Sequence, residues 1–136
     1  MAKLIQQNID RLCAEVGFSI PQVSLDKSKQ ENTIQKALGV LSQDGVFAYM
    51  IWLESRNSLH PTAGKVDEIT AKNIHEKSSE ILKCMKLIED HTDYKGLRDK
   101  LTRSNGVLED IHQMFLVKQV FERMLTYALY RAKSFP

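Results

Sequence analysis

The second half of the chain contains no proline between Pro61 and Pro136, and the whole sequence has only three prolines and six glycines. A β sandwich or barrel needs turn residues every ~8–12 residues, so this scarcity argues against one. Apolar residues instead recur at intervals of three and four, which places them on one face of an α-helix. With 136 residues, of which 43% are hydrophobic, the chain can bury the core of one domain. The sequence therefore predicts an all-α, single-domain bundle of four to five helices over residues 1–136, with long second and last helices.

The first predicted helix covers Ala2–Val16, and Gly17 is expected to follow its last residue. Residues 17–28 are predicted to form a loop, because Pro21 disfavours helix at the residue before it. Four apolar side chains of this loop are expected either to reach the core or to mark a partner surface: Phe18, Ile20, Val23 and Leu25.

Ser28 and Glu31 fit a capping box, which predicts the start of a long helix that runs to about Arg56. Two apolar stripes within this helix indicate that it is covered on more than one side. Gly39 and Gly45 would each cost ~1 kcal/mol relative to alanine in a helix interior. A helix that keeps them is expected to have another backbone close by, and a break near Gly45 is the alternative interpretation.

The rest of the chain is predicted to form three further helices. A linker over residues 56–65 contains Pro61 and Gly64 and is followed by a helix from about Val66 to Asp90. A short helix is predicted over residues 93–104, and the last helix over residues 107–133.

No motif in the sequence supports an enzyme. Glu109 and His112 form a Glu-x-x-His pair that would share one face of a helix. A di-iron bundle needs that motif on two helices, and His75 and His91 have no glutamate three residues before them. Phosphate-cradling glycine loops, nucleophile elbows and zinc-ligand spacings are absent from the sequence. We therefore expect a non-catalytic protein with no metal, no cofactor and no small-molecule substrate.

Cys13 and Cys84 are too few for a disulfide framework, which favours a reducing compartment. Both are expected to be buried and inert thiols, because no neighbouring residue looks like a thiolate activator. No apolar run approaches the ~20 residues of a membrane span, and charges interrupt the first apolar stretch, unlike a signal peptide. These features predict a cytoplasmic protein with no membrane contact.

Positive charge is concentrated in the last 42 residues, which hold eight Lys and Arg and four Asp and Glu. Cations interleaved with Tyr127 and Tyr130 can neutralise phosphates and stack on bases. The alternative is a solvated face whose C-terminal cations complement a helix dipole. Trp52 is expected to be a core or interface anchor. The candidate nucleic-acid-binding residues are Arg98, Lys100, Arg103, Lys118, Arg123, Arg131 and Lys133.

Two stretches carry a family resemblance: residues 34–53, IQKALGVLSQDGVFAYMIWL, and residues 116–133, LVKQVFERMLTYALYRAK. With the chain length and the helical pattern, they resemble the small helical subunit of type III-B (Cmr) CRISPR effector complexes. The resemblance rests on apolar spacing and a basic last helix over about 40 residues. The small subunit of type III-A complexes is an alternative within the same class.

The resemblance implies a non-catalytic role in antiviral defence. Subunits of that kind stack along a filament of larger backbone subunits and line the channel in which guide and target RNA pair. The implied partners are the other subunits, further copies of this chain, and the backbones of guide RNA and target RNA. The alternative is a helical protein–protein adaptor with no nucleic-acid role, whose surface would include the loop residues above and any exposed part of Phe47–Trp52.

Overall fold

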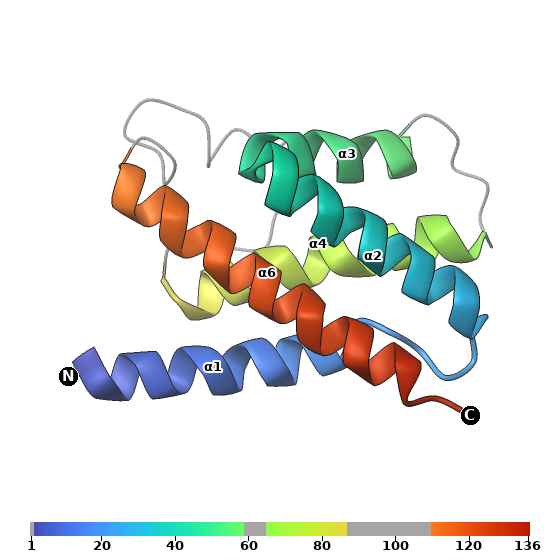
Figure 1. Ribbon diagram of the computed structural model, residues 1–136, viewed down its shortest axis with the longest axis horizontal. Coiled ribbons are helices and arrows are strands. Elements are labelled where there is room, and N and C mark those ends of the chain that lie inside the picture. The colour runs from blue at the N-terminus through green and yellow to red at the C-terminus, as the bar shows by residue number, and fades with distance from the viewer. Residues whose placement is uncertain (1, 59–64, 87–109) are drawn as a thin grey trace.

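Five helices and no strand are found in residues 2–58, 65–86 and 110–136, which are the residues that the computed structural model describes (Figure 1). The all-α prediction is confirmed. The predicted short helix over residues 93–104 lies outside the described residues. The helices are α1 (Ala2–Phe18), α2 (Lys27–Asp44), α3 (Val46–Ser58), α4 (Val66–Cys84) and α6 (Ile111–Lys133).

A break at Gly45 separates α2 from α3, so the prediction of one continuous helix to Arg56 is wrong and its alternative is confirmed. Gly45 has a φ of 93°, a conformation that residues with a Cβ rarely adopt. Its N–H donates to the carbonyl of Leu41 at 3.1 Å and so satisfies the end of α2. The chain then reverses, and α3 returns alongside α2 (Figure 1).

Aspartates cap α2 and α6. The Asp26 carboxylate accepts a hydrogen bond from the Lys29 amide at 2.9 Å, so α2 begins before Ser28 and the predicted serine cap is wrong. The Asp110 carboxylate accepts from the His112 amide at 2.8 Å at the start of α6. Both aspartates satisfy first-turn N–H groups and place negative charge at the positive end of a helix dipole.

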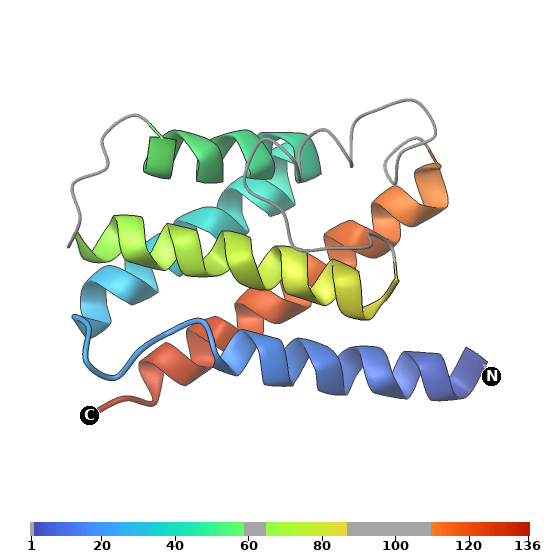
Figure 2. The ribbon, with the colours of Figure 1, turned by 180° about the vertical axis from the view of Figure 1, so that it is seen from behind.

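Helix α6 crosses one side of the molecule and α4 crosses the other, as opposite views show (Figures 1 and 2). α6 packs on α1 and α2, and α4 packs on α2 and α3. The core lies between α6 on one side and α4 on the other. It contains the fully buried Tyr49 and Phe121, whose ring centroids are 5.3 Å apart. The Tyr49 hydroxyl lies 2.6 Å from the Ser78 hydroxyl, so its polar end is satisfied within the core.

At Gly17, the backbone of α1 lies close against the backbone of α6. It lies inside α1, which continues to Phe18, so the prediction that α1 ends before Gly17 is wrong. A Cβ at Gly17 would overlap the carbonyl oxygen of Met124 on α6. By contrast, a Cβ at Gly39 or Gly45 would meet no atom of the described residues within 4 Å. The predicted close approach of another backbone at Gly39 and Gly45 is therefore wrong.

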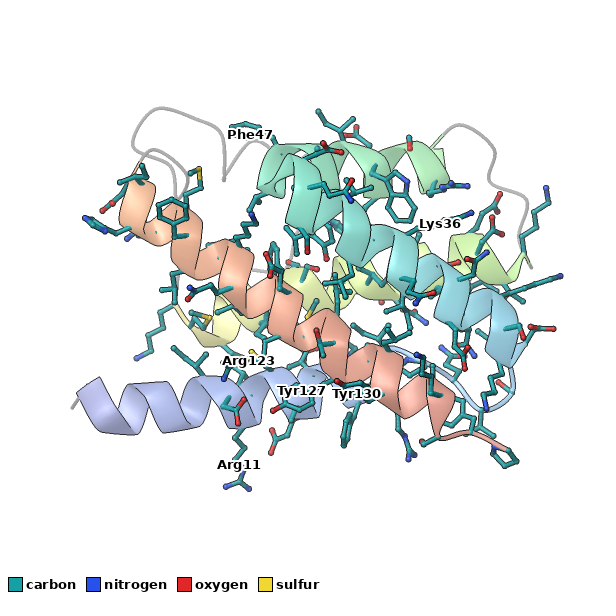
Figure 3. The ribbon with its side chains drawn as sticks, in the orientation of Figure 1. Arg11, Lys36, Phe47, Arg123, Tyr127 and Tyr130 are labelled. Atoms are coloured by element: carbon teal, nitrogen blue, oxygen red, sulfur yellow. The ribbon has the colours of Figure 1, made fainter. Side chains whose placement is uncertain are left out.

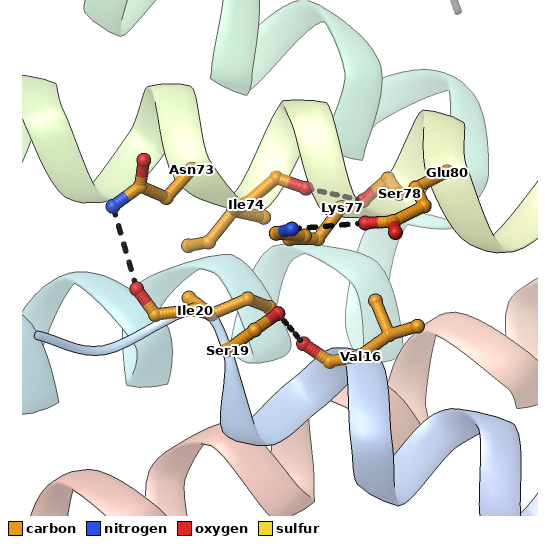
Figure 4. Close-up of polar contacts among 8 residues, drawn as sticks. All are labelled: Val16, Ser19, Ile20, Asn73, Ile74, Lys77, Ser78 and Glu80. Atoms are coloured by element: carbon orange, nitrogen blue, oxygen red, sulfur yellow. Dashed lines mark hydrogen bonds and ion pairs between the residues drawn. The ribbon is translucent and has the colours of Figure 1, made fainter.

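The loop between α1 and α2 is held by buried polar contacts. The Gln30 amide donates to the carbonyls of Gln22 and Leu25 at 2.8 and 3.2 Å, and its oxygen accepts from the Gln22 N–H at 2.7 Å. Asn73 of α4 donates to the carbonyl of Ile20, which is fully buried (Figure 4). The loop thereby joins the core at Ile20, whereas Phe18 and Val23 stay exposed.

The two cysteines differ in exposure, and the prediction that both are buried is wrong for Cys84, which is exposed. Cys13 is fully buried between α1 and α6 and donates to the carbonyl of Val120 at 3.6 Å. Burial raises the pKa of the Cys13 thiol to about 11. At pH 8 the buried thiol therefore stays protonated and unreactive.

We expect a thiol-specific disulfide reagent at pH 8 to modify Cys84 within minutes in the native protein and Cys13 only after unfolding. Titration should count one reactive thiol before denaturant and two after it. Cys84→Ser should abolish the fast reaction, whereas fast modification of Cys13 in that variant would contradict the packing of α1 on α6.

None of the helices that the structure describes is both long and apolar enough to cross a membrane.

Candidate nucleic-acid interface

Two of the predicted cations on α6 contact residues of neighbouring helices. Lys118 donates to the carbonyl of Ser42 on α2 at 3.4 Å and lies 3.9 Å from the Glu122 carboxylate. Arg123 contacts the Asp10 carboxylate of α1 at 2.9 Å. Because one faces α2 and the other faces α1, the structure does not bring Lys118 and Arg123 together in a single strip.

Asp10 also accepts a hydrogen bond from Tyr127, at 2.8 Å from its hydroxyl. This hydrogen bond raises the pKa of Tyr127, because it stabilises the protonated phenol beside a carboxylate. Arg123, Tyr127 and Tyr130 follow one another along the side of α6 that faces α1 (Figure 3). Tyr127 packs edge-on against Phe18, whereas Tyr130 is 62% exposed. Of the two tyrosines, Tyr130 is the one available to an external partner.

Arg131 and Lys133 are exposed in the last turn of α6. The Arg131 guanidinium lies 5.2 Å from the ring centroid of Phe135, which is buried. Lys27, from the first turn of α2, donates to the Phe135 carbonyl at 2.9 Å. The structure therefore places a cation of α2 beside the two predicted cations of α6. The other predicted cations, Arg98, Lys100 and Arg103, lie outside the described residues.

The same end of the molecule gathers the start of α2, the end of α3, the start of α4 and the end of α6 (Figures 1 and 2). Each of these helix ends carries a basic residue. We call this surface the basic end; its residues are Lys27, Lys29, Arg56, Lys65, Arg131 and Lys133. Acidic residues lie here too, with Asp26 capping α2 and Asp67 and Glu68 in the first turn of α4.

A pocket of about 490 Å³ opens into the basic end between α2, α3 and the start of α4. Its walls hold four cations and one carboxylate, together with the indole of Trp52. Trp52 is partly buried, and the Arg56 guanidinium lies 5.1 Å from its ring centroid. The lining residues are Lys29, Asn32, Thr33, Lys36, Trp52, Arg56, Lys65, Val66 and Asp67.

Sequence reasoning did not find this pocket, because its cations come from the half of the chain with a net negative charge. A local signal was present: Lys29 and Lys36 are seven residues apart on α2, and Trp52 and Arg56 are four apart on α3. Such spacings put each pair on one helix face. The position of the two faces relative to each other depends on the turn at Gly45.

Within the part of the chain that is described, no three His, Cys, Asp or Glu side chains gather in a way that suits a metal ion. Glu109 lies outside the described residues, and His112 is exposed at the start of α6. No family model, curated protein or solved structure matches the chain.

Proposed function

We propose that the chain is a non-catalytic small subunit of a type III CRISPR RNA-guided effector complex, which contacts the backbones of guide and target RNA. The observation that carries the proposal is the basic end, where four helix termini that carry six cations gather at one end of the molecule. The resemblance of residues 34–53 and 116–133 to the small type III-B subunit names the class of assembly. Phosphate backbones are bound by surfaces of this kind through charge, without reading of sequence.

The near-neutral net charge of +2 agrees with a subunit that larger neighbours position on RNA. Such a subunit needs only weak contacts of its own, because the assembly supplies the rest of the affinity. The proposed partners are the other subunits, further copies of this chain and the RNA backbones. We place the assembly in the cytoplasm.

The basic end can be tested by charge reversal. We expect Arg131→Glu combined with Lys133→Glu to weaken binding of a single-stranded RNA by about tenfold or more at low salt. The slope of log affinity against log salt should fall by about 1.4, at about 0.7 for each lost phosphate contact on a single strand. Fluorescence anisotropy of a labelled oligonucleotide measures both quantities.

A control with the same change of net charge is Arg11→Glu combined with Lys83→Glu. Both residues are exposed and lie away from the basic end, and Arg11 points away from α6 (Figure 3). The control should bind RNA nearly as well as the unmodified protein. Equal loss of binding in the two double variants would show that net charge, and not this surface, is responsible.

A second candidate function, a helical adaptor that binds only proteins, is favoured by two exposed apolar residues on α3. Phe47 and Ile51 lie one turn apart and are 48% and 55% exposed, and Phe47 points away from the bundle (Figure 3). Of the predicted adaptor residues in the loop, Phe18 and Val23 are exposed and Ile20 is buried. Native purification distinguishes the two functions. An adaptor would co-purify with protein partners and without RNA, whereas a subunit of an RNA-guided complex would co-purify with RNA.

A further inference from the structure

The pocket between α2, α3 and α4 combines two features, a group of cations and an aromatic side chain. Among the described residues, four cations line it, from α2, α3 and the N-cap position of α4, with one carboxylate, that of Asp67. No ion pair joins Lys29, Lys36, Arg56 or Lys65 to another residue within the described ranges. Their charges are therefore available to an external anion.

The second feature is an aromatic wall. Trp52 and Arg56 lie together as an indole and a planar guanidinium, with 5.1 Å between the Arg56 carbon and the ring centroid. A cation–π pair of this kind offers an aromatic surface and a bidentate donor at one place. Aromatic and guanidinium planes are the surfaces on which unpaired bases stack.

A nucleotide satisfies both features, because it carries a phosphate and a flat base. Multivalent anions without a base would use the cations alone, and an apolar ligand would leave four charges to be desolvated. The volume of about 490 Å³ is large enough for one nucleotide.

We infer that this pocket binds one nucleotide of a single RNA strand, with its phosphate among Lys29, Lys36 and Lys65 and its base against the Trp52–Arg56 pair. The inference rests on the proposed function for the source of the nucleotide. It adds a defined subsite to what is otherwise a surface contacted through charge. The same chemistry is offered by a free nucleotide, so the experiment includes both sources.

Trp52 is the only tryptophan of the chain, so its fluorescence reports on this pocket alone. We expect an eight-residue oligouridylate to quench or shift Trp52 emission saturably, with uridine monophosphate acting only at much higher concentration. Anisotropy of a labelled form of the same oligonucleotide reports total RNA binding. If the oligonucleotide binds without changing Trp52 emission, the pocket inference is wrong, whereas the proposed function stands. If uridine monophosphate acts at the lower concentration, the strand is not the ligand and the inference fails.

Charge reversal at the pocket is the matching variant. We expect Lys29→Glu combined with Lys36→Glu to weaken the emission change by tenfold or more, because both side chains line the pocket. The control Arg11→Glu with Lys83→Glu should leave the emission change in place. An emission change that survives reversal of Lys29 and Lys36 would overturn the assignment of the phosphate.

The aromatic wall has its own test. Trp52→Ala should reduce oligouridylate affinity by about fivefold to a hundredfold, the range found when a stacking platform is removed. Trp52→Phe keeps an aromatic face and should retain most of the affinity, which separates stacking from loss of fold. Equal affinity of the alanine and phenylalanine variants, with both folded by circular dichroism, would contradict a stacked base.

Discussion

Replacing Gly17 with alanine is expected to lower the free energy of unfolding by about 3 kcal/mol. The new Cβ would overlap the carbonyl oxygen of Met124, a backbone atom that cannot rotate away. Relief requires α1 to move off α6, which loosens the packing of Cys13 and Val16. Urea denaturation followed by circular dichroism should show a lower midpoint with an unchanged slope.

Gly39→Ala is the matched control for this prediction. Gly39 also lies within a helix, but a Cβ there would meet no atom of the described residues within 4 Å. Alanine has the higher helix propensity, so this variant should gain about 0.5–1 kcal/mol. We therefore expect the free energy of unfolding to fall in Gly17→Ala and to rise in Gly39→Ala. A Gly17→Ala protein as stable as the unmodified one would show that α1 does not approach α6 this closely.

Truncation of Phe121 to alanine is expected to destabilise the fold by about 3–5 kcal/mol. Phe121 is fully buried and packs against Tyr49, so its removal leaves a cavity beside a large ring. Domains have total stabilities of about 5–15 kcal/mol, so this loss is a large part of the whole. Thermal and urea unfolding should both report it, and near-ultraviolet circular dichroism should show the altered environment of Tyr49.

Phe115 offers a control on the same helix, with the same side chain and 53% exposure. Phe115→Ala should change the free energy of unfolding by no more than about 0.5 kcal/mol. Similar losses at Phe115 and Phe121 would mean that α6 is rotated about its axis relative to the structure described above. If Phe121→Ala lowered the free energy of unfolding only slightly, Phe121 would not lie in the core.

The helical class could be predicted because apolar spacing and scarce turn residues depend only on local sequence. The roles of the glycines could not, because a glycine within a helix looks the same in sequence whether it ends the helix or touches another one. Gly17 touches α6 and Gly45 turns the chain, whereas Gly39 does neither. Deciding among these roles requires knowing which helix lies opposite, and that is a property of the tertiary structure.

The candidate interface was predictable only in part for a similar reason. Arg131 and Lys133 are exposed as the charge distribution suggested, but Lys118 and Arg123 bind neighbouring helices. The sequence alone placed all four on one helix without telling which side each would face. The additional cations of the basic end come from helices that are distant in sequence, so no count along the chain brings them together.

The pairing of α1 with α6 has a consequence for synthesis on the ribosome. The Arg123–Asp10 contact joins residues 113 positions apart in the sequence, and the Cys13–Val120 hydrogen bond joins residues 107 positions apart. During synthesis α1 therefore leaves the exit tunnel long before α6, and the part of its apolar stripe that packs on α6 stays uncovered until α6 has been made. In that interval the stripe is open to chaperones, and the docking of α1 on α6 is limited by closure of a very long loop.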